Sequence, residues 1–163
     1  MGKDKPSDEN TYTDPEGFRI DVSTAALNHG LKAAKNIDSF LGKNKKNMIP
    51  RNLPIHLEML LAKKGLKKAD VARGSELNRK YVYQIFDGTK TPSRDKLIAI
   101  AFGLQLSDEE TQTMLKLSEN RELYVRDERD AIILFALQRK MNIMKTNELL
   151  NSHGHKLLGN WDD

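Results

Sequence analysis

The chain has 163 residues, of which 27 are Lys or Arg and 23 are Asp or Glu, so its formal net charge at pH 7 is +4. This length allows one or two small domains, and the absence of cysteine excludes a disulfide framework and a thiolate metal site. No apolar run is long enough to cross a bilayer, and the polar N-terminus lacks the apolar core of a signal peptide, so we expect a cytoplasmic protein with no membrane partner.

The charge is distributed unevenly along the chain. Subtracting Asp and Glu from Lys and Arg gives −3 for residues 1–17, +4 for 18–50, +6 for 51–106 and −3 for 107–163. A basic middle with an acidic end is the distribution expected if the middle binds phosphates. A basic face that is merely solvated would have the same composition.

The chain before residue 50 is predicted to have two parts. Residues 1–17 contain two prolines and no periodic apolar pattern, so we predict a disordered tail. Residues 18–49 are predicted to form an N-terminal helix and a basic linker, with Ser23 as the N-cap and the helix running to about Leu41. Its apolar stripe consists of Leu27, Leu31, Ala34, Ile37 and Leu41. The stripe favours packing that completes the core, or contact with a second subunit.

Residues 50–120 carry the pattern of five consecutive helices, and capping residues and glycines mark their ends. The five are a helix capped by Asn52 and closed by Gly65, a helix from Lys67 to Gly74, a helix from Arg79 to Phe86, a helix capped by Ser93 that runs to Phe102, and a helix that begins at Ser107. The second and third helices are joined by a short turn, Ser75–Leu77, which predicts a helix-turn-helix.

The third of these helices has a distinct apolar face. Val82, Ile85 and Phe86 fall at i, i+3 and i+4, and Asn78 is a suitable N-cap. The remaining positions are basic, aromatic or amide side chains. A helix with a basic N-terminus and an amide further along suits the major groove of DNA.

Residues 121–163 predict a C-terminal helical hairpin. One helix runs from Asp127 to Lys140 and a second from Ile143 to about Leu158. The apolar band of the first helix consists of Ala131, Ile132, Ile133, Leu134, Phe135, Ala136 and Leu137. Such a band exceeds what one hairpin can bury alone, so it packs either on the preceding helices or on a second copy of itself.

The helix-turn-helix stretch resembles the Cro/phage-repressor (XRE) family. The matching residues are Val71-Ala72, Leu77-Asn78, Val82, Ile85 and Phe86-Asp87-Gly88, flanked by Gly65-Leu66, Thr91-Pro92-Ser93 and the apolar helix that ends at Gly103. The chain departs from the family at Glu76, where Gly is usual, and at Lys68, where Gln is frequent. The resemblance implies an all-α fold in which a five-helix repressor-like domain, residues 50–120, follows the N-terminal helix and precedes the hairpin. It also implies a bacterial transcription regulator with a C-terminal extension.

The resemblance and the chemistry of the side chains together suggest which residues contact double-stranded DNA. Arg79, Lys80 and Gln84 are the predicted base contacts, because Arg and Lys donate to guanine and Gln pairs with adenine. Tyr81 and Tyr83 either contact the DNA or pack beside neighbouring helices. The predicted phosphate contacts are Lys67, Lys68, Lys90 and Arg94.

The sequence shows no set of residues typical of an enzyme active site, and we predict no cofactor and no catalytic or metal site. His153 and His155 form a pair without a third ligand at a recognisable spacing, which favours an exposed loop or a frayed helix end over a metal site. His56, near a helix start, is expected at the surface.

Three expectations about function follow. The favoured one is sequence-specific DNA binding by a transcription regulator. The rival is a protein-interaction module in which the helix-turn-helix is a scaffold and either the aromatic recognition helix or the acidic hairpin binds a protein. An antitoxin, which binds both DNA and a protein, lies between the two. We also expect a homodimer on paired half-sites, because one such domain reads only a few base pairs.

Overall fold

The computed structural model describes residues 23–48 and 52–159, and every regular element within those ranges is a helix, which confirms the predicted all-α class. The chain divides into two compact units, Met1–Ile49 and Pro50–Asp163. The predicted disordered tail, residues 1–17, lies outside the described residues. Among the described helices, none is both long and apolar enough to span a membrane.

The described part of the first unit contains two α-helices and a short 3-10 turn. These are α1 (Thr24–Ala33), α2 (Ile37–Lys43) and η2 (Lys45–Asn47). The prediction of one helix from Ser23 to about Leu41 is therefore wrong. The chain becomes extended at Ala34, and Asn36 starts a new helix by accepting a hydrogen bond from the Ser39 amide at 2.8 Å. An Asn side chain that can cap competes with helix continuation, and here the cap prevails.

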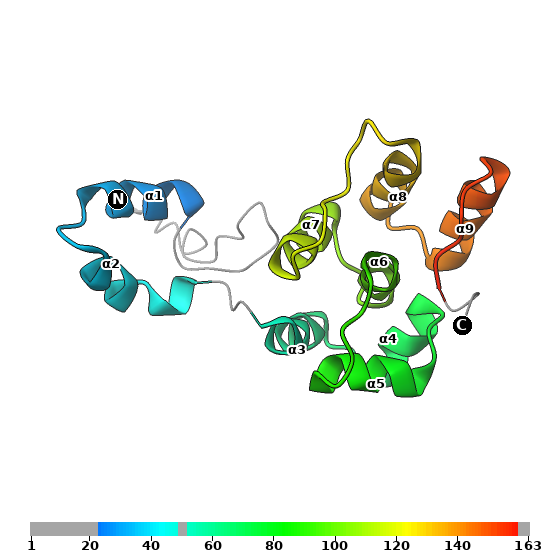
Figure 1. Cartoon of the computed structure of the whole chain (residues 1–163), viewed down its shortest axis with the longest axis horizontal. Helices are drawn as coiled ribbons and strands as arrows, with labels where there is room; N and C mark the ends of the chain where they lie inside the picture. The colour runs from blue at the N-terminus through cyan, green and yellow to red at the C-terminus, as the bar shows by residue number, and fades with distance from the viewer. Residues whose placement is uncertain (1–22, 49–51, 160–163) are drawn as a thin grey trace, which may run out of the picture. The chain divides into compact units, whose positions relative to one another are not determined.

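The second unit contains seven helices between residues 52 and 159, drawn from cyan to red in Figure 1. They are α3 (Leu53–Lys64), α4 (Lys68–Ser75), α5 (Arg79–Asp87), α6 (Arg94–Gly103), α7 (Asp108–Leu117), α8 (Glu128–Gln138) and α9 (Ile143–Ser152). Figure 1 shows α6 in the middle of this unit, with the other six helices around it.

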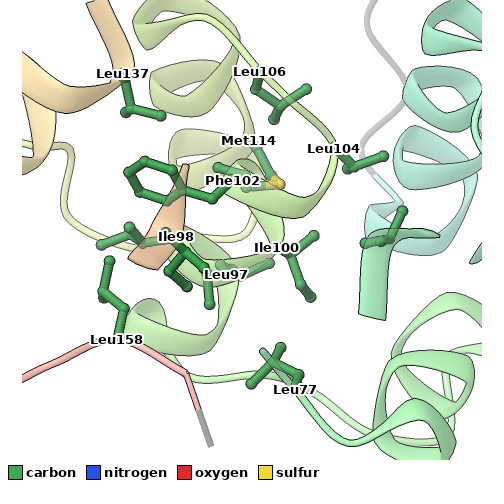
Figure 2. Close-up of a cluster of buried hydrophobic side chains, with 14 of the residues drawn as sticks. Leu77, Leu97, Ile98, Ile100, Phe102, Leu104, Leu106, Met114, Leu137 and Leu158 are labelled. Atoms are coloured by element: carbon green, nitrogen blue, oxygen red, sulfur yellow. The ribbon is translucent and has the colours of Figure 1, made fainter. Parts of the chain in front are cut away.

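The sequence of α6 explains its central position. All residues from Leu97 to Leu104 are buried, so the helix has no solvent-facing side over two turns. A helix that is apolar all round has to be covered all round. Figure 2 shows the result, a cluster in which Leu137 and Leu158 from the C-terminal segment join the side chains of α6.

Two glycines bring the backbones of α4 and α6 together. A Cβ added at Gly103 would lie 2.4 Å from the carbonyl oxygen of Val71, and one added at Gly74 would lie 3.0 Å from the Cα of Gly103. No side chain fits between the two helices at this point. The position of α4 on the central helix therefore depends on these two residues.

The C-terminal helices share the core of α3–α7. Ile133, Ala136 and Leu137 of α8 are buried in the same cluster as α6, so most of the apolar band is internal to one chain. Helix α9 ends at Ser152 and does not continue to about Leu158 as predicted. Beyond it the chain is held by two hydrogen bonds of 2.8 and 3.0 Å between Asn147 and the backbone of Leu158.

His56 is buried, which corrects the prediction of a surface residue. It lies on α3 near Glu110, a buried carboxylate that also accepts hydrogen bonds from Lys63 and Lys64 at 2.9 and 2.8 Å. Burial lowers the pKa of His56 to about 4, although the charge of Glu110 acts in the opposite direction. A histidine with this pKa stays neutral in the folded protein at every pH above 5.

The burial of His56 predicts a loss of stability in mild acid. In the unfolded chain its pKa is near 6.5, so between pH 6.5 and 4 the unfolded state binds more protons and stability falls as the pH falls. We expect the free energy of unfolding to drop by about 2 kcal/mol between pH 7 and pH 5. Urea unfolding at each pH measures this drop. The His56→Leu variant is the control, and a drop of the same size in that variant would contradict the assignment to His56.

Candidate nucleic-acid interface

The turn between α4 and α5 is built around one residue with a left-handed backbone. Glu76 ends α4 at φ 54°, and the Leu77 amide donates back to the Ala72 carbonyl at 3.3 Å. Leu77 is buried and anchors the turn in the core. Gly adopts this left-handed conformation without strain, whereas Glu76 meets strain there.

Helix α5 starts at a strong cap and buries one face. The Asn78 side chain accepts hydrogen bonds from the amides of Lys80 and Tyr81 at 2.9 and 3.3 Å. Val82, Ile85 and Phe86 are at most 3% exposed. The helix is therefore fixed against the core along its length, and its opposite face has a defined orientation.

The exposed face of α5 brings together the three predicted base contacts. Arg79 and Lys80 are exposed in the first turn, and Gln84 is half-buried one turn further on. The Arg79 Nε donates to the Tyr83 hydroxyl at 3.0 Å, and its guanidinium lies 5.5 Å from the Tyr83 ring. This contact holds the Arg79 side chain along the outer surface of the helix.

The two tyrosines differ in their surroundings. Tyr81 is partly buried, packs against the core and has the Lys96 ammonium 5.8 Å from its ring. Tyr83 is 38% exposed and lies on the same face as Arg79. Tyr81 therefore packs beside the neighbouring helices, whereas Tyr83 is exposed and can contact a ligand.

Asp87, a residue that the sequence interpretation missed, lies at the far end of the same face. It follows Lys80 by seven residues and Tyr83 by four, a spacing that places all three on one side of a helix. Hydrogen bonds from the side chain and amide of Thr89 hold the pKa of Asp87 below its usual value, so it is ionised at neutral pH. A carboxylate here would repel phosphate and could accept a hydrogen bond from the amino group of cytosine.

The predicted phosphate contacts fall into two groups. Lys67 and Lys90 are exposed, and Lys68 is partly exposed with an ion pair to Glu58 at 3.1 Å. These three lysines lie at the start of α4 and in the loop after α5. Lys67 and Lys90 are exposed to solvent, whereas the Lys68 ammonium is engaged by Glu58 and lies 5.6 Å from the centre of the Phe86 ring.

Arg94 has a structural role that the sequence prediction did not anticipate. Its guanidinium donates to Asp130 at 2.9 and 3.3 Å and to the carbonyls of Arg121 and Glu122 at 2.7 and 3.0 Å. The neighbouring Asp95 accepts from Arg129 at 2.8 and 3.2 Å, so the first turns of α6 and α8 are joined by two ion pairs of opposite sense. With its donors engaged inside the protein, Arg94 is not placed to contact phosphate.

The histidine pair at the end of α9 does not converge on one point. His155 Nε2 lies 2.8 Å from a carboxylate oxygen of Glu128, whereas His153 Nδ1 lies 2.9 Å from the Leu149 carbonyl. Within residues 23–48 and 52–159, no group of three or more His, Asp or Glu side chains could hold a metal ion.

Comparison of the chain with protein-family models, with curated proteins and with solved structures gave no match.

The left-handed backbone at Glu76 predicts a stabilising substitution. Replacing Glu76 with Gly removes a strain that non-glycine residues meet at positive φ, so we expect Glu76→Gly to raise the free energy of unfolding by about 1 kcal/mol. Glu148→Gly, at an exposed right-handed position in α9, should lower it by about 1 kcal/mol. Denaturant unfolding measures both changes, and a destabilised Glu76→Gly variant would show that the turn has another geometry.

Proposed function

We propose that this protein binds double-stranded DNA sequence-specifically, with α5 as the helix that enters the major groove, and that it regulates transcription. The observation that carries the proposal is the exposed face of α5, on which Arg79, Lys80, Tyr83 and Gln84 stand on a helix whose other face is buried. The α4–turn–α5 arrangement would then act as a helix-turn-helix of the XRE type. This reading fits a bacterial cytoplasmic regulator that needs no cofactor.

The side chains on the exposed face of α5 favour recognition of DNA bases over attraction to phosphates alone. A guanidinium, an ammonium and a carboxamide can each satisfy a different base edge in the major groove, and Asp87 adds an acceptor for cytosine. An acidic side chain on a face that bound only phosphates would weaken the contact. The buried side of α5 fixes the backbone from which these groups project, and a fixed backbone supports discrimination between bases.

The lysines near α5 support a second kind of contact, with the phosphates of the DNA. Lys67, Lys68 and Lys90 flank the helix, and phosphate contacts of this kind position a domain without reading sequence. Binding that releases counterions from several phosphates weakens as salt rises. The interaction should therefore depend steeply on ionic strength.

The experiment that tests the proposal is selection of bound duplexes from a random DNA pool, followed by titration of the enriched duplex at several salt concentrations. Enrichment of one motif, with an affinity that falls steeply as salt rises, is the expected result. An unenriched pool would favour the rival, in which the same helices are a scaffold for a protein partner. An affinity that does not change with salt would exclude phosphates as the main contact.

Substitutions separate base reading from positioning. Arg79→Ala and Gln84→Ala should each relax the preference at particular base pairs by about 1–3 kcal/mol. Lys67→Ala should weaken binding to all sequences about equally. Lys145→Ala, an exposed lysine at the start of α9, is the matched control and should leave binding unchanged. If the Arg79 and Gln84 variants keep the original preference, α5 does not read the bases.

A further inference from the structure

The outer face of α8 carries a continuous stripe of side chains, of which Ile132 is partly buried against the core and the other three are exposed. Glu128, Ile132, Phe135 and Arg139 recur at intervals of three or four residues, so they lie in line along one side of the helix. Ile133, Ala136 and Leu137 on the opposite side are buried. Most of the apolar band of α8 is therefore buried, and Phe135 is the residue of the band that is exposed in this stripe.

The stripe has an apolar centre with charged ends. Phe135 is 43% exposed, and the guanidinium of Arg139 lies 3.8 Å from the centre of its ring. Ile132 is half-buried beside it. The Glu128 side chain is 68% exposed even though it pairs with His155.

The order of charges along the stripe makes it complementary to itself. Glu128 lies at the start of α8 and Arg139 at its C-cap, about 16 Å apart along the axis. In an antiparallel pair of α8 helices with a two-fold axis between Ile133 and Leu134, Glu128 faces the partner's Arg139. The same register places Ile132 opposite the partner's Phe135. A surface that matches itself in this way is what an isologous dimer interface requires.

We propose that two copies of this chain dimerise through α8, antiparallel and in this register. The apolar centre, which consists of the exposed Phe135 and the half-buried Ile132, provides the contact. The end charges set orientation and register, since rim charges contribute more to specificity than to affinity. The surface is small, so the dimer should form at micromolar to tens of micromolar concentration. Figure 1 shows α5 and α8 on opposite sides of α6, so the dimer leaves both α5 helices accessible. The proposal does not depend on DNA binding.

Sedimentation velocity of the full chain without DNA, from about 1 to 100 μM, tests the dimer. We expect a concentration-dependent dimer that Phe135→Ala weakens at least about ten-fold, because each dimer loses two aromatic side chains from its centre. Met144→Ala removes a side chain on α9 that is 61% exposed, and it should leave the dimer unchanged. A monomer over the whole range, or a dimer indifferent to Phe135→Ala, would overturn the proposal.

Charge reversal tests the register. Glu128→Arg and Arg139→Glu each bring like charges together in a dimer of one variant, so each alone should be weaker than the original chain. Mixing the two variants restores opposite charges at both ends, and we expect them to form a heterodimer. Circular dichroism confirms that each variant is folded. If the mixture of folded variants remains monomeric, or if each variant dimerises as the original chain does, the antiparallel register is wrong.

Discussion

The burial of α6 on all sides is the constraint on which the rest of the second unit depends. Because no residue from Leu97 to Leu104 reaches solvent, neighbouring helices have to cover every side of α6. Its contact with α4 is set by Gly74 and Gly103, where the two backbones come so close that a Cβ would collide. The orientation of α5 follows, since α5 is joined to α4 by a short turn and buries Val82, Ile85 and Phe86.

Local signals in the sequence predicted much of this arrangement. Asn52, Asn78, Ser93 and Ser107 cap helices where they were expected to, because a cap depends on residues within one turn of the chain. The break before α2 also has a local signal, the capping side chain of Asn36, but the apolar spacing through Ala34 and Ile37 predicts one continuous helix there. An apolar period that continues a helix and a side chain that caps a new one can conflict, and the sequence alone does not show which of the two determines the structure.

The features that sequence could not supply depend on residues far apart in the chain. The burial of His56 depends on α3 meeting α7 near Glu110, 54 positions away. The role of Arg94 depends on Asp130, 36 positions away. Both are polar residues that a local reading assigns to the surface, since most such residues are exposed. On α5, by contrast, the helical period placed Arg79, Lys80 and Tyr83 at the surface, because their exposure depends on the helix itself.

The two Arg–Asp pairs between α6 and α8 bear on whether the C-terminal helices form a separate module. Arg94 and Asp130 are 18% and 2% exposed at their side chains, and a buried charge left without its partner costs roughly 3–5 kcal/mol. A chain ending at residue 120 would lack Asp130 and Arg129, and it would also uncover the part of α6 that Leu137 and Leu158 protect. Helices α3 to α9 therefore belong to one compact unit with a shared core. Any contact made at α8 acts on the same rigid body that carries α5.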